Sequence, residues 1–182
     1  MKRSLTIGGI ALALGACAPE STPQPAPEAP PATNMIEVEL ERVTPLGPGE
    51  SLGIATLAES AEGVLIRIAL AGLTPGPHGF HVHENGSCAP EDGEPAGAAG
   101  PHFDPTDSGT HQGPQGQGHL GDLPRLQADA EGRARAEFVA ARIASLQTLR
   151  GRTLIVHAEG DSYADVPPNG GAGARVACGV II

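Results

Sequence analysis

The sequence predicts an all-β domain built as an antiparallel sandwich or barrel. Apolar and polar residues alternate clearly over 36–41 and again over 64–70, and this period of two is typical of strands that bury one face. About eight short segments have strand character while helical periodicity is almost lacking, which favours a sandwich or barrel. With three Phe, one Tyr and no Trp in the chain, the core is expected to be aliphatic.

The first sixteen residues have the pattern of an export signal that is not part of the fold. Lys2 and Arg3 form a short positive head before the apolar stretch 5–14, and about ten residues are too few for a membrane-spanning helix, which needs roughly 20. Leu-Gly-Ala-Cys at 14–17 resembles the lipobox of bacterial lipoproteins, which makes Cys17 the expected lipidation site. The alternative is an ordinary signal peptide cleaved nearby, which would leave Cys17 as an unpaired thiol.

A tether and a single domain are expected after the signal. Pro, Ala and Glu dominate the chain up to residue 33, and this composition cannot offset its ordering entropy, so 17–34 should form an extended tether. Residues 35–182, about 150 in number, fit one domain with one core. The formal net charge of −10 becomes −12 without Lys2 and Arg3, and no lysine then remains, which argues against a nucleic-acid partner.

The remaining strand candidates are short aliphatic or alternating runs bounded by turn residues. In chain order they are 52–57, 80–84, 123–128, 133–139, 153–157 and 175–181. Two long segments interrupt this pattern, since 85–121 is rich in Gly, Pro, Asp and His, and 158–174 has the same Gly and Pro character. A structureless loop of the first length is uncommon in a compact domain unless a function organises it, and metal ligation would do so.

Histidines make the case for a metal site. His81 and His83 are residues i and i+2 of a predicted strand, so their imidazoles point to the same face. The pair alone would be weak evidence, because two histidines can share a face by chance or serve as polar surface. Further candidates are His102, His111 and His119 in the first long loop, and His157 at the end of a strand.

A carboxylate extends this set. Asp122 follows His119 by three residues, and zinc readily accepts a carboxylate beside imidazole. Two four-coordinate metals need eight ligands, which these seven side chains supply if one histidine binds both metals, so the count permits a bridged pair without proving one. His78 has the opposite strand parity to His81 and His83, and we expect it to be a hydrogen-bonded framework histidine.

Four motifs resemble those of copper,zinc superoxide dismutases of the bacterial type. They are Gly-Phe-His-Val-His at 79–83, Gly-Pro-His-Phe-Asp-Pro at 100–105, His-Leu-Gly-Asp-Leu at 119–123 and Gly-Ala-Arg-Val-Ala-Cys-Gly-Val-Ile at 173–181. The similarity covers 35–182. It implies a flattened eight-stranded antiparallel Greek-key β-barrel or sandwich, immunoglobulin-like in architecture, with two long functional loops.

The resemblance implies an enzyme that converts two superoxide anions to oxygen and hydrogen peroxide. Together with the export signal and the lipobox, it implies a membrane-anchored periplasmic lipoprotein that protects the cell envelope. It assigns one copper and one zinc per chain: copper bound by His81, His83, His102 and His157, and zinc bound by His102, His111, His119 and Asp122. His102 is then the bridging imidazolate and transfers a proton. An all-imidazole set suits copper(II), whereas three histidines and a carboxylate suit zinc.

The resemblance also gives roles to residues that bind no metal. Asp161 matches the aspartate that links a copper histidine to a zinc histidine, and the alternative is a solvated loop carboxylate. Cys88 and Cys178 match the family's disulfide, with two free thiols as the alternative. Arg175 matches the arginine that attracts superoxide at the mouth of the copper site, and the alternative is a surface arginine at the start of a strand.

The segment between Cys88 and His102 departs from part of the family pattern. Residues 89–95 form a longer insertion than in the eukaryotic enzymes, and its only charges are acidic, so we do not expect it to steer superoxide. A periplasmic copper and zinc buffer with the same ligands is the main rival to the enzyme, and a β-sandwich adhesion or scaffold domain is the third possibility. The sequence allows either a monomer or a homodimer.

Overall fold

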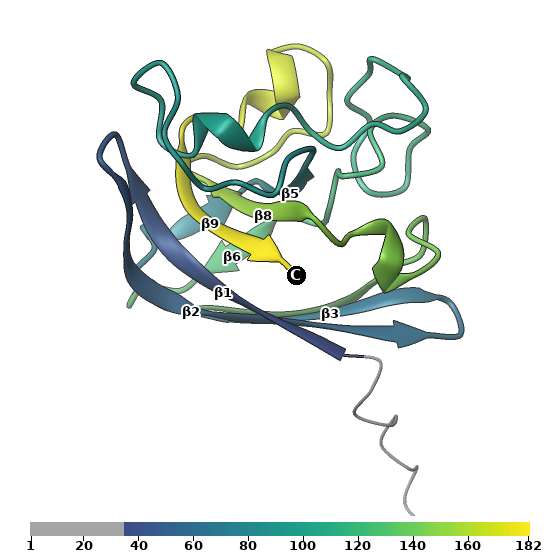
Figure 1. The fold of residues 1–182 in the computed structure, drawn as a ribbon, viewed down its shortest axis with the longest axis horizontal. Coiled ribbons are helices and arrows are strands. Elements are labelled where there is room, and N and C mark those ends of the chain that lie inside the picture. The colour runs from purple at the N-terminus through teal and green to yellow at the C-terminus, as the bar shows by residue number, and fades with distance from the viewer. Residues whose placement is uncertain (1–34) are drawn as a thin grey trace, which may run out of the picture. The chain divides into compact units, whose positions relative to one another are not determined.

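The computed structural model describes residues 35–182, so the expected signal peptide, the lipidation site Cys17 and the tether lie outside the described residues. Residues 35–182 form an all-β fold with short 3-10 helices, none of which could span a lipid bilayer (Figure 1). The strands are β1 (Met35–Thr44), β2 (Gly47–Ser60), β3 (Gly63–Leu70), β4 (Gly76–His78), β5 (Phe80–His83), β6 (Leu126–Ala128), β7 (Ala134–Ala140), β8 (Arg152–His157) and β9 (Arg175–Ile181). The 3-10 helices are η2 (Gly97–Ala99), η3 (Leu146–Thr148) and η4 (Pro168–Gly171).

The strands form one antiparallel sheet that closes almost into a barrel. Their order across the sheet is β4-β6-β7-β3-β2-β1-β9-β8-β5. The two edge strands, β4 and β5, are consecutive in the chain, with only Gly79 between them. The two edges must therefore lie next to each other, and the sheet curls round its core. The predicted antiparallel Greek-key barrel is confirmed, and its ninth strand is the short β4.

Strand lengths differ from those that the sequence pattern predicted. β2 is 14 residues long and extends beyond 52–57 at both ends, because it pairs along its length with β1 and β3. Near Gly53 the register with β1 shifts, which breaks the alternation that the pattern depends on. A Cβ at Gly53 would lie 2.1 Å from the carbonyl oxygen of Ala69, so this position requires glycine. β4 was not expected, because Gly-Pro-His shows no alternation.

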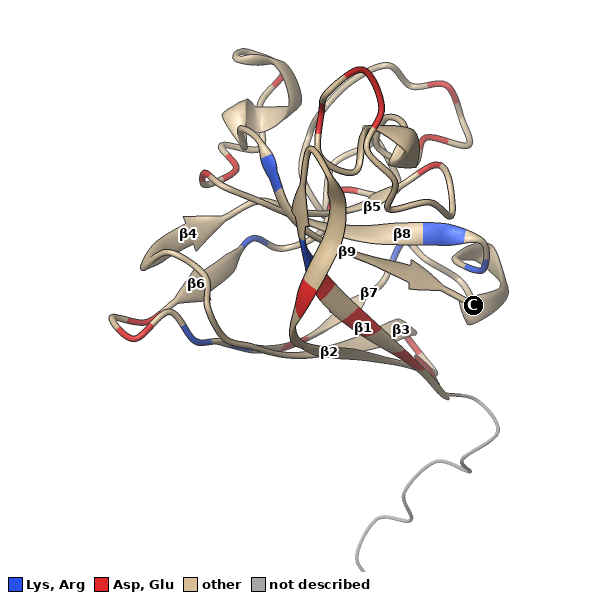
Figure 2. Cartoon of the chain, turned by 60° about the vertical axis from the view of Figure 1, so that its left-hand side comes forward, with Lys and Arg blue, Asp and Glu red and all other residues tan. Residues whose placement is uncertain are grey.

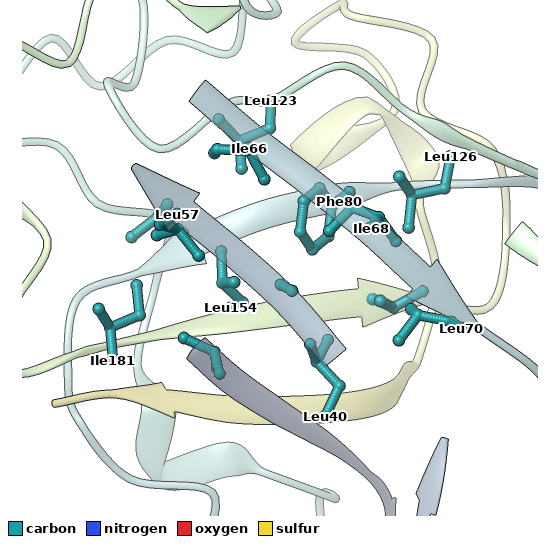
Figure 3. Packing of buried hydrophobic residues seen from close by; sticks show 14 of the residues in the cluster. Leu40, Leu57, Ile66, Ile68, Leu70, Phe80, Leu123, Leu126, Leu154 and Ile181 are labelled. Atoms are coloured by element: carbon teal, nitrogen blue, oxygen red, sulfur yellow. The ribbon is translucent and has the colours of Figure 1, made fainter. Parts of the chain in front are cut away.

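The core inside the barrel is aliphatic, as predicted. Phe80 is fully buried among leucine and isoleucine side chains (Figure 3), and its ring meets that of Phe138 edge-on with centroids 6.5 Å apart. Burying each such side chain stabilises the fold by about 1.5–3 kcal/mol. Phe80 and Val82 of β5 both point into this core, so β5 is held rigidly. The alternate residues of β5 then face away from the core.

The two long loops cover one side of the barrel, next to β5 and β8 (Figure 1). A small second cluster of buried side chains joins the first loop to the sheet and consists of Val43, Ala96, Ala99, Ile155 and Cys178. A disulfide joins Cys88 to Cys178 of β9, with Cα atoms 5.7 Å apart, which confirms the predicted pairing. The first loop is therefore packed and covalently tied to the sheet.

Candidate metal centre

Two neighbouring strands supply three buried histidines that face one another. His81 and His83 alternate with the core residues of β5, so they project from the opposite side of the strand, beneath the loops. His157 ends β8, and its ring centroid lies 4.9 Å from that of His81 and 5.5 Å from that of His83. None of the three residues is more than 5% exposed.

The first long loop brings the other predicted side chains to the same place. His102 and Asp122 pair with the free edge of β5 through isolated β-bridges, so both are positioned by the sheet. His111 and His119 lie between them in the sequence, and their ring centroids lie 5.4 and 5.3 Å from that of His102. The side chain of His119 is the most accessible of these, at 14% exposed.

One group consists of four imidazoles whose ring nitrogens converge. Nδ1 of His83 and Nδ1 of His157 donate to backbone carbonyls, at 2.8 and 3.0 Å, which leaves their Nε2 atoms 3.3 Å from each other. Nδ1 of His81 and Nε2 of His102 are buried without a hydrogen-bond partner. One ligand atom from each of these histidines lies within 4.8 Å of the others. This is the set that the sequence resemblance assigns to copper.

A second group has the carboxylate of Asp122 at its centre. Its oxygens lie 3.0, 3.1 and 3.3 Å from the Nδ1 atoms of His102, His111 and His119, respectively. A tetrahedral zinc ion with ligands at about 2.0–2.1 Å would separate its ligand atoms by roughly 3.3–3.4 Å. The three spacings are therefore close to those of a zinc site, and these are the residues that the sequence resemblance assigns to zinc.

His102 and Asp161 connect the two groups. Nδ1 of His102 faces Asp122, while its Nε2 belongs to the four-imidazole group. Asp161 lies behind both groups, with Oδ2 2.8 Å from Nε2 of His81 and Oδ1 2.8 Å from Nε2 of His111. Asp161 is 1% exposed, which a solvated loop carboxylate would not be.

The electrostatics of the cluster favour ionised carboxylates and mostly neutral imidazoles. Burial raises the pKa of Asp122, but the imidazoles of His102 and His111 beside it outweigh this effect and hold that pKa well below its usual range. Burial lowers the pKa of His111, yet the adjacent carboxylates of Asp122 and Asp161 raise the pKa to about 9. Burial is the main cause that lowers the pKa of His157 to about 3 and the pKa of His102 to about 4. Neutral imidazole and ionised carboxylate are the forms that bind metals.

Buried atoms without partners show that the cluster suits cations. Within residues 35–182, several buried side-chain atoms lack any hydrogen-bond partner, although such atoms nearly always have one. They are Nδ1 of His81, Nε2 of His102, Nδ1 of His111, Nδ1 of His119 and Oδ2 of Asp122. Each carries a lone pair when its group is deprotonated, so metal ions would satisfy all of them. The residues present fit copper and zinc.

An open cavity of about 320 Å³ gives access to the four-imidazole group. It is lined by His83, Glu94, Pro101, His102, His157, Pro168, Asn169, Gly171, Ala172, Gly173 and Arg175. The side chain of Arg175 is 12% exposed, and its Nη atoms donate to the carbonyls of Ala96, Gly97 and Gly100. A larger hollow of 470 Å³ over β2, β3 and β7 contains none of the clustered histidines. Acidic residues lie along β1 and on the loops (Figure 2), and the formal net charge of the chain is −10.

Known proteins match this combination of fold and site. The family model of copper/zinc superoxide dismutase (SODC) matches residues 51–181. This chain belongs to the copper/zinc superoxide dismutase family. A superoxide dismutase [Cu-Zn] from Brucella abortus biovar 1 (strain 9-941) is 48% identical over 149 residues, which cover 79% of this chain and 86% of the relative.

Solved superoxide dismutase structures share the fold. The Cu/Zn superoxide dismutase from Brucella abortus has a TM-score of 0.78 and 46% identity, and the match covers 81% of this chain and 99% of that chain. The monomeric copper, zinc superoxide dismutase from Salmonella enterica has a TM-score of 0.72 and 44% identity, with the same coverage. Membership implies superoxide as substrate and copper and zinc as cofactors, so the chain is an enzyme of this family rather than a metal buffer or an adhesion domain.

The structure brings together every side chain that the sequence suggested as a metal ligand of this superoxide dismutase. His78 lies outside both groups. Its Nδ1 lies 2.6 Å from the carbonyl oxygen of His157 and its Nε2 lies 2.8 Å from that of Thr74. These contacts agree with the framework role expected for His78.

Two contacts at the site were not foreseen. The carbonyl of Gly100 accepts hydrogen bonds from both Nδ1 of His83 and Nη2 of Arg175, at 2.8 and 2.7 Å. The guanidinium of Arg142 donates to the carbonyls of His119 and the preceding glycine, at 3.0 and 2.7 Å. Gly100 could have been noticed from its place in the motif 100–105. Arg142 has no such signal, because its partners are backbone groups more than 20 residues away in the sequence.

Proposed function

We propose that the two groups bind one copper and one zinc per chain as a bridged pair. Copper would be held by His81, His83, His102 and His157. Zinc would be held by His102, His111, His119 and Asp122. The single observation that carries this partition is the position of His102, whose Nδ1 lies 3.0 Å from Asp122 while its Nε2 is a buried nitrogen without a partner in the four-imidazole group. The side chain of His102 would therefore belong to both ligand sets.

In dismutation, the residues of the chain hold the metals, orient the superoxide anion and supply a proton to the product. Copper, when bound, supplies the one-electron redox chemistry that converts two superoxide anions and two protons to oxygen and hydrogen peroxide. His102 lines the cavity, so a proton held at its Nε2 while that nitrogen is not bound to copper would lie next to the arriving anion and supply one of the two protons that peroxide needs. On the other side of the same ring, Nδ1 of His102 lies 3.0 Å from Asp122, and both would hold zinc, which would fix the orientation of the ring.

Arg175 attracts and orients the anion. It lines the cavity together with three of the histidines assigned to copper. The formal net charge is −10, or −12 without Lys2 and Arg3, so superoxide meets an unfavourable overall field and depends on a local cation. The hydrogen bonds from Nη1 and Nη2 to backbone carbonyls hold the guanidinium in place.

The Arg175→Glu variant tests this function. We expect kcat/KM for superoxide to fall by at least tenfold while both metals are retained, because the charge that attracts the anion is reversed. Any fall in rate with added salt should flatten or reverse. Arg150→Glu is the matched control, since Arg150 is exposed and does not line the cavity. A full rate with unchanged salt dependence in Arg175→Glu would mean that Arg175 is ordinary surface charge.

The chain is organised as a signal peptide at 1–16, a lipidated Cys17 with a tether to 34, and the enzyme domain at 35–182. This places the activity in the periplasm or elsewhere outside the cytoplasm, on a membrane, where it protects the cell envelope from superoxide. The lipobox-like motif and the disulfide support this proposal, because disulfides persist in oxidising compartments. Mass spectrometry of the mature N-terminus is the test: a diacylated Cys17 is expected, and an unmodified N-terminus beyond Cys17 would contradict the anchor.

The domain acts as a monomer or a homodimer. The relative from Salmonella enterica, which is monomeric, favours the monomer. Sedimentation equilibrium of the Cys17→Ser chain should give the mass of one chain, and a mass of two chains would favour the homodimer.

A further inference from the structure

Glu94 places a negative charge beside Nε of the Arg175 guanidinium. Its Oε1 lies 3.8 Å from Nε of Arg175, and Glu94 lines the same cavity as the histidines of the four-imidazole group. The two Nη atoms of Arg175 are engaged by backbone carbonyls. Among the described residues, Glu94 is the one acidic group that contacts its Nε. The carboxylate therefore lies where an incoming anion would find an unused N–H donor.

A tight turn holds Glu94 at this position. The backbones of Glu91 and Glu94 exchange hydrogen bonds of 3.1 and 2.9 Å. Asp92 and Gly93 between them have φ angles of +52° and +81°. Positive φ at both central positions is the pattern of a type I′ turn, which Asp-Gly favours. The same loop supplies the carbonyls that bind Arg175, so Glu94 and Arg175 are positioned by one short segment.

Stability alone is a weak reason for this contact. The side chain of Glu94 is 60% exposed, and ion pairs at such exposure contribute little to folding because water screens them. An anion in the cavity is nevertheless repelled by this carboxylate, because Glu94 lines the same cavity. The repulsion grows in proportion to the charge of the anion. A dianion such as hydrogen phosphate is therefore repelled twice as strongly as superoxide.

We propose that Glu94 is an internal competitor for the anion site of Arg175 and selects singly charged over multiply charged anions. The inference rests on the proposed role of Arg175. Glu94 lowers the affinity of the cavity for every anion, but it lowers the affinity for phosphate most. Glu94 slightly lowers the rate at which superoxide enters the cavity. In return, it keeps the cavity free of dianions such as hydrogen phosphate.

Anion titrations of the full chain loaded with copper and zinc test the proposal. Azide, a monoanion, is followed by the absorption change of copper(II) on binding, and phosphate is followed by its competition with azide. In Glu94→Gln we expect the dissociation constant for azide to fall about threefold and that for phosphate about tenfold, since the repulsion scales with charge. The kcat/KM for superoxide should rise about twofold to threefold. Asp92→Asn is the matched control, because it removes one charge from the same turn, does not line the cavity, and keeps a residue that tolerates positive φ.

The outcomes separate this proposal from the function on which it rests. Equal dissociation constants in Glu94→Gln and the unsubstituted protein, or equal shifts in Glu94→Gln and Asp92→Asn, would overturn it. Arg175→Gln is the second arm and should weaken the binding of both anions. If Arg175→Gln weakens them and Glu94→Gln changes nothing, Arg175 keeps its role and Glu94 loses the one proposed here. If neither substitution changes anion binding, both proposals fall.

Discussion

Nε2 of His81 lies 2.8 Å from Oδ2 of Asp161, and neither side chain is exposed to solvent. Because Nε2 donates this hydrogen bond, Nδ1 of His81 is left as a lone-pair donor facing the other imidazoles. The second oxygen of the same carboxylate lies 2.8 Å from Nε2 of His111. One buried aspartate thus orients a ring in each of the two groups, as carboxylates behind metal-bound histidines commonly do.

Asp161→Asn should weaken the binding of both metals. The amide keeps the shape of the side chain but loses the negative charge and one acceptor, and substitutions behind metal-bound histidines typically cost about 10–100-fold in affinity. Competition with chelators of known affinity measures the effect for each metal. Asp129→Asn serves as control, because Asp129 is an exposed carboxylate whose side chain bonds Arg133 and a backbone N–H. Wild-type affinity for both metals in Asp161→Asn would show that Asp161 does not orient the rings.

His157→Ala should lose copper and activity while it keeps zinc. His157 belongs to the four-imidazole group and is not part of the group around Asp122. Its removal leaves three nitrogens for copper and all four ligand side chains for zinc. Elemental analysis of the variant after dialysis against both metals checks the expectation. Loss of both metals to the same extent would contradict the proposed partition.

Arg142→Gln should speed the release of zinc. The guanidinium donates to the carbonyls of His119 and the preceding glycine, and a hydrogen bond from a charged donor contributes about 1.5–3 kcal/mol. We expect the zinc dissociation rate to rise about tenfold and the copper dissociation rate to change less than twofold. Arg150→Gln is the matched control. Equal release rates in the two variants would mean that Arg142 does not hold the loop for zinc.

Cys88→Ser should lower the free energy of unfolding of the metal-free protein. The disulfide to Cys178 spans 90 residues, for which loop-closure entropy predicts about 4–5 kcal/mol, less any strain. Urea denaturation of the oxidised protein and of the variant measures the difference. The substitution should also slow the enzyme, because the loop that carries the carbonyl partners of Arg175 is released from β9. An unchanged denaturation midpoint would show that packing alone holds this loop.

The sequence predicted the fold class and the clustering of the histidines because both depend on short patterns. Alternation of apolar and polar residues indicates strands. The H-x-H spacing places His81 and His83 on one face of a strand, independently of the rest of the chain. The extension of β2 and the existence of β4 depend on pairing with distant strands, which no local pattern encodes. The same holds for Arg142, whose partners are backbone carbonyls.

The contact between Glu94 and Arg175 marks the limit of prediction at the site. The sequence showed an acidic insertion and an arginine in a family motif, but 81 positions separate Glu94 from Arg175. Only the turn at Asp92 and Gly93 and the folding of the loop over β9 bring the two charges together. From the sequence, we expected only that the acidic insertion would not steer superoxide. The structure shows that one of its carboxylates, Glu94, lies beside Arg175.

The decay of superoxide, measured by stopped flow on the full chain at defined metal content, tests the central claim most directly. The account predicts that elemental analysis finds one copper and one zinc per chain, and that this form consumes superoxide catalytically while the form loaded with zinc alone does not. Catalysis should disappear in His102→Ala, together with the ability to bind both metals at once. A chain that binds only one metal, or that holds one copper and one zinc and leaves the decay of superoxide at its spontaneous rate, would contradict the account.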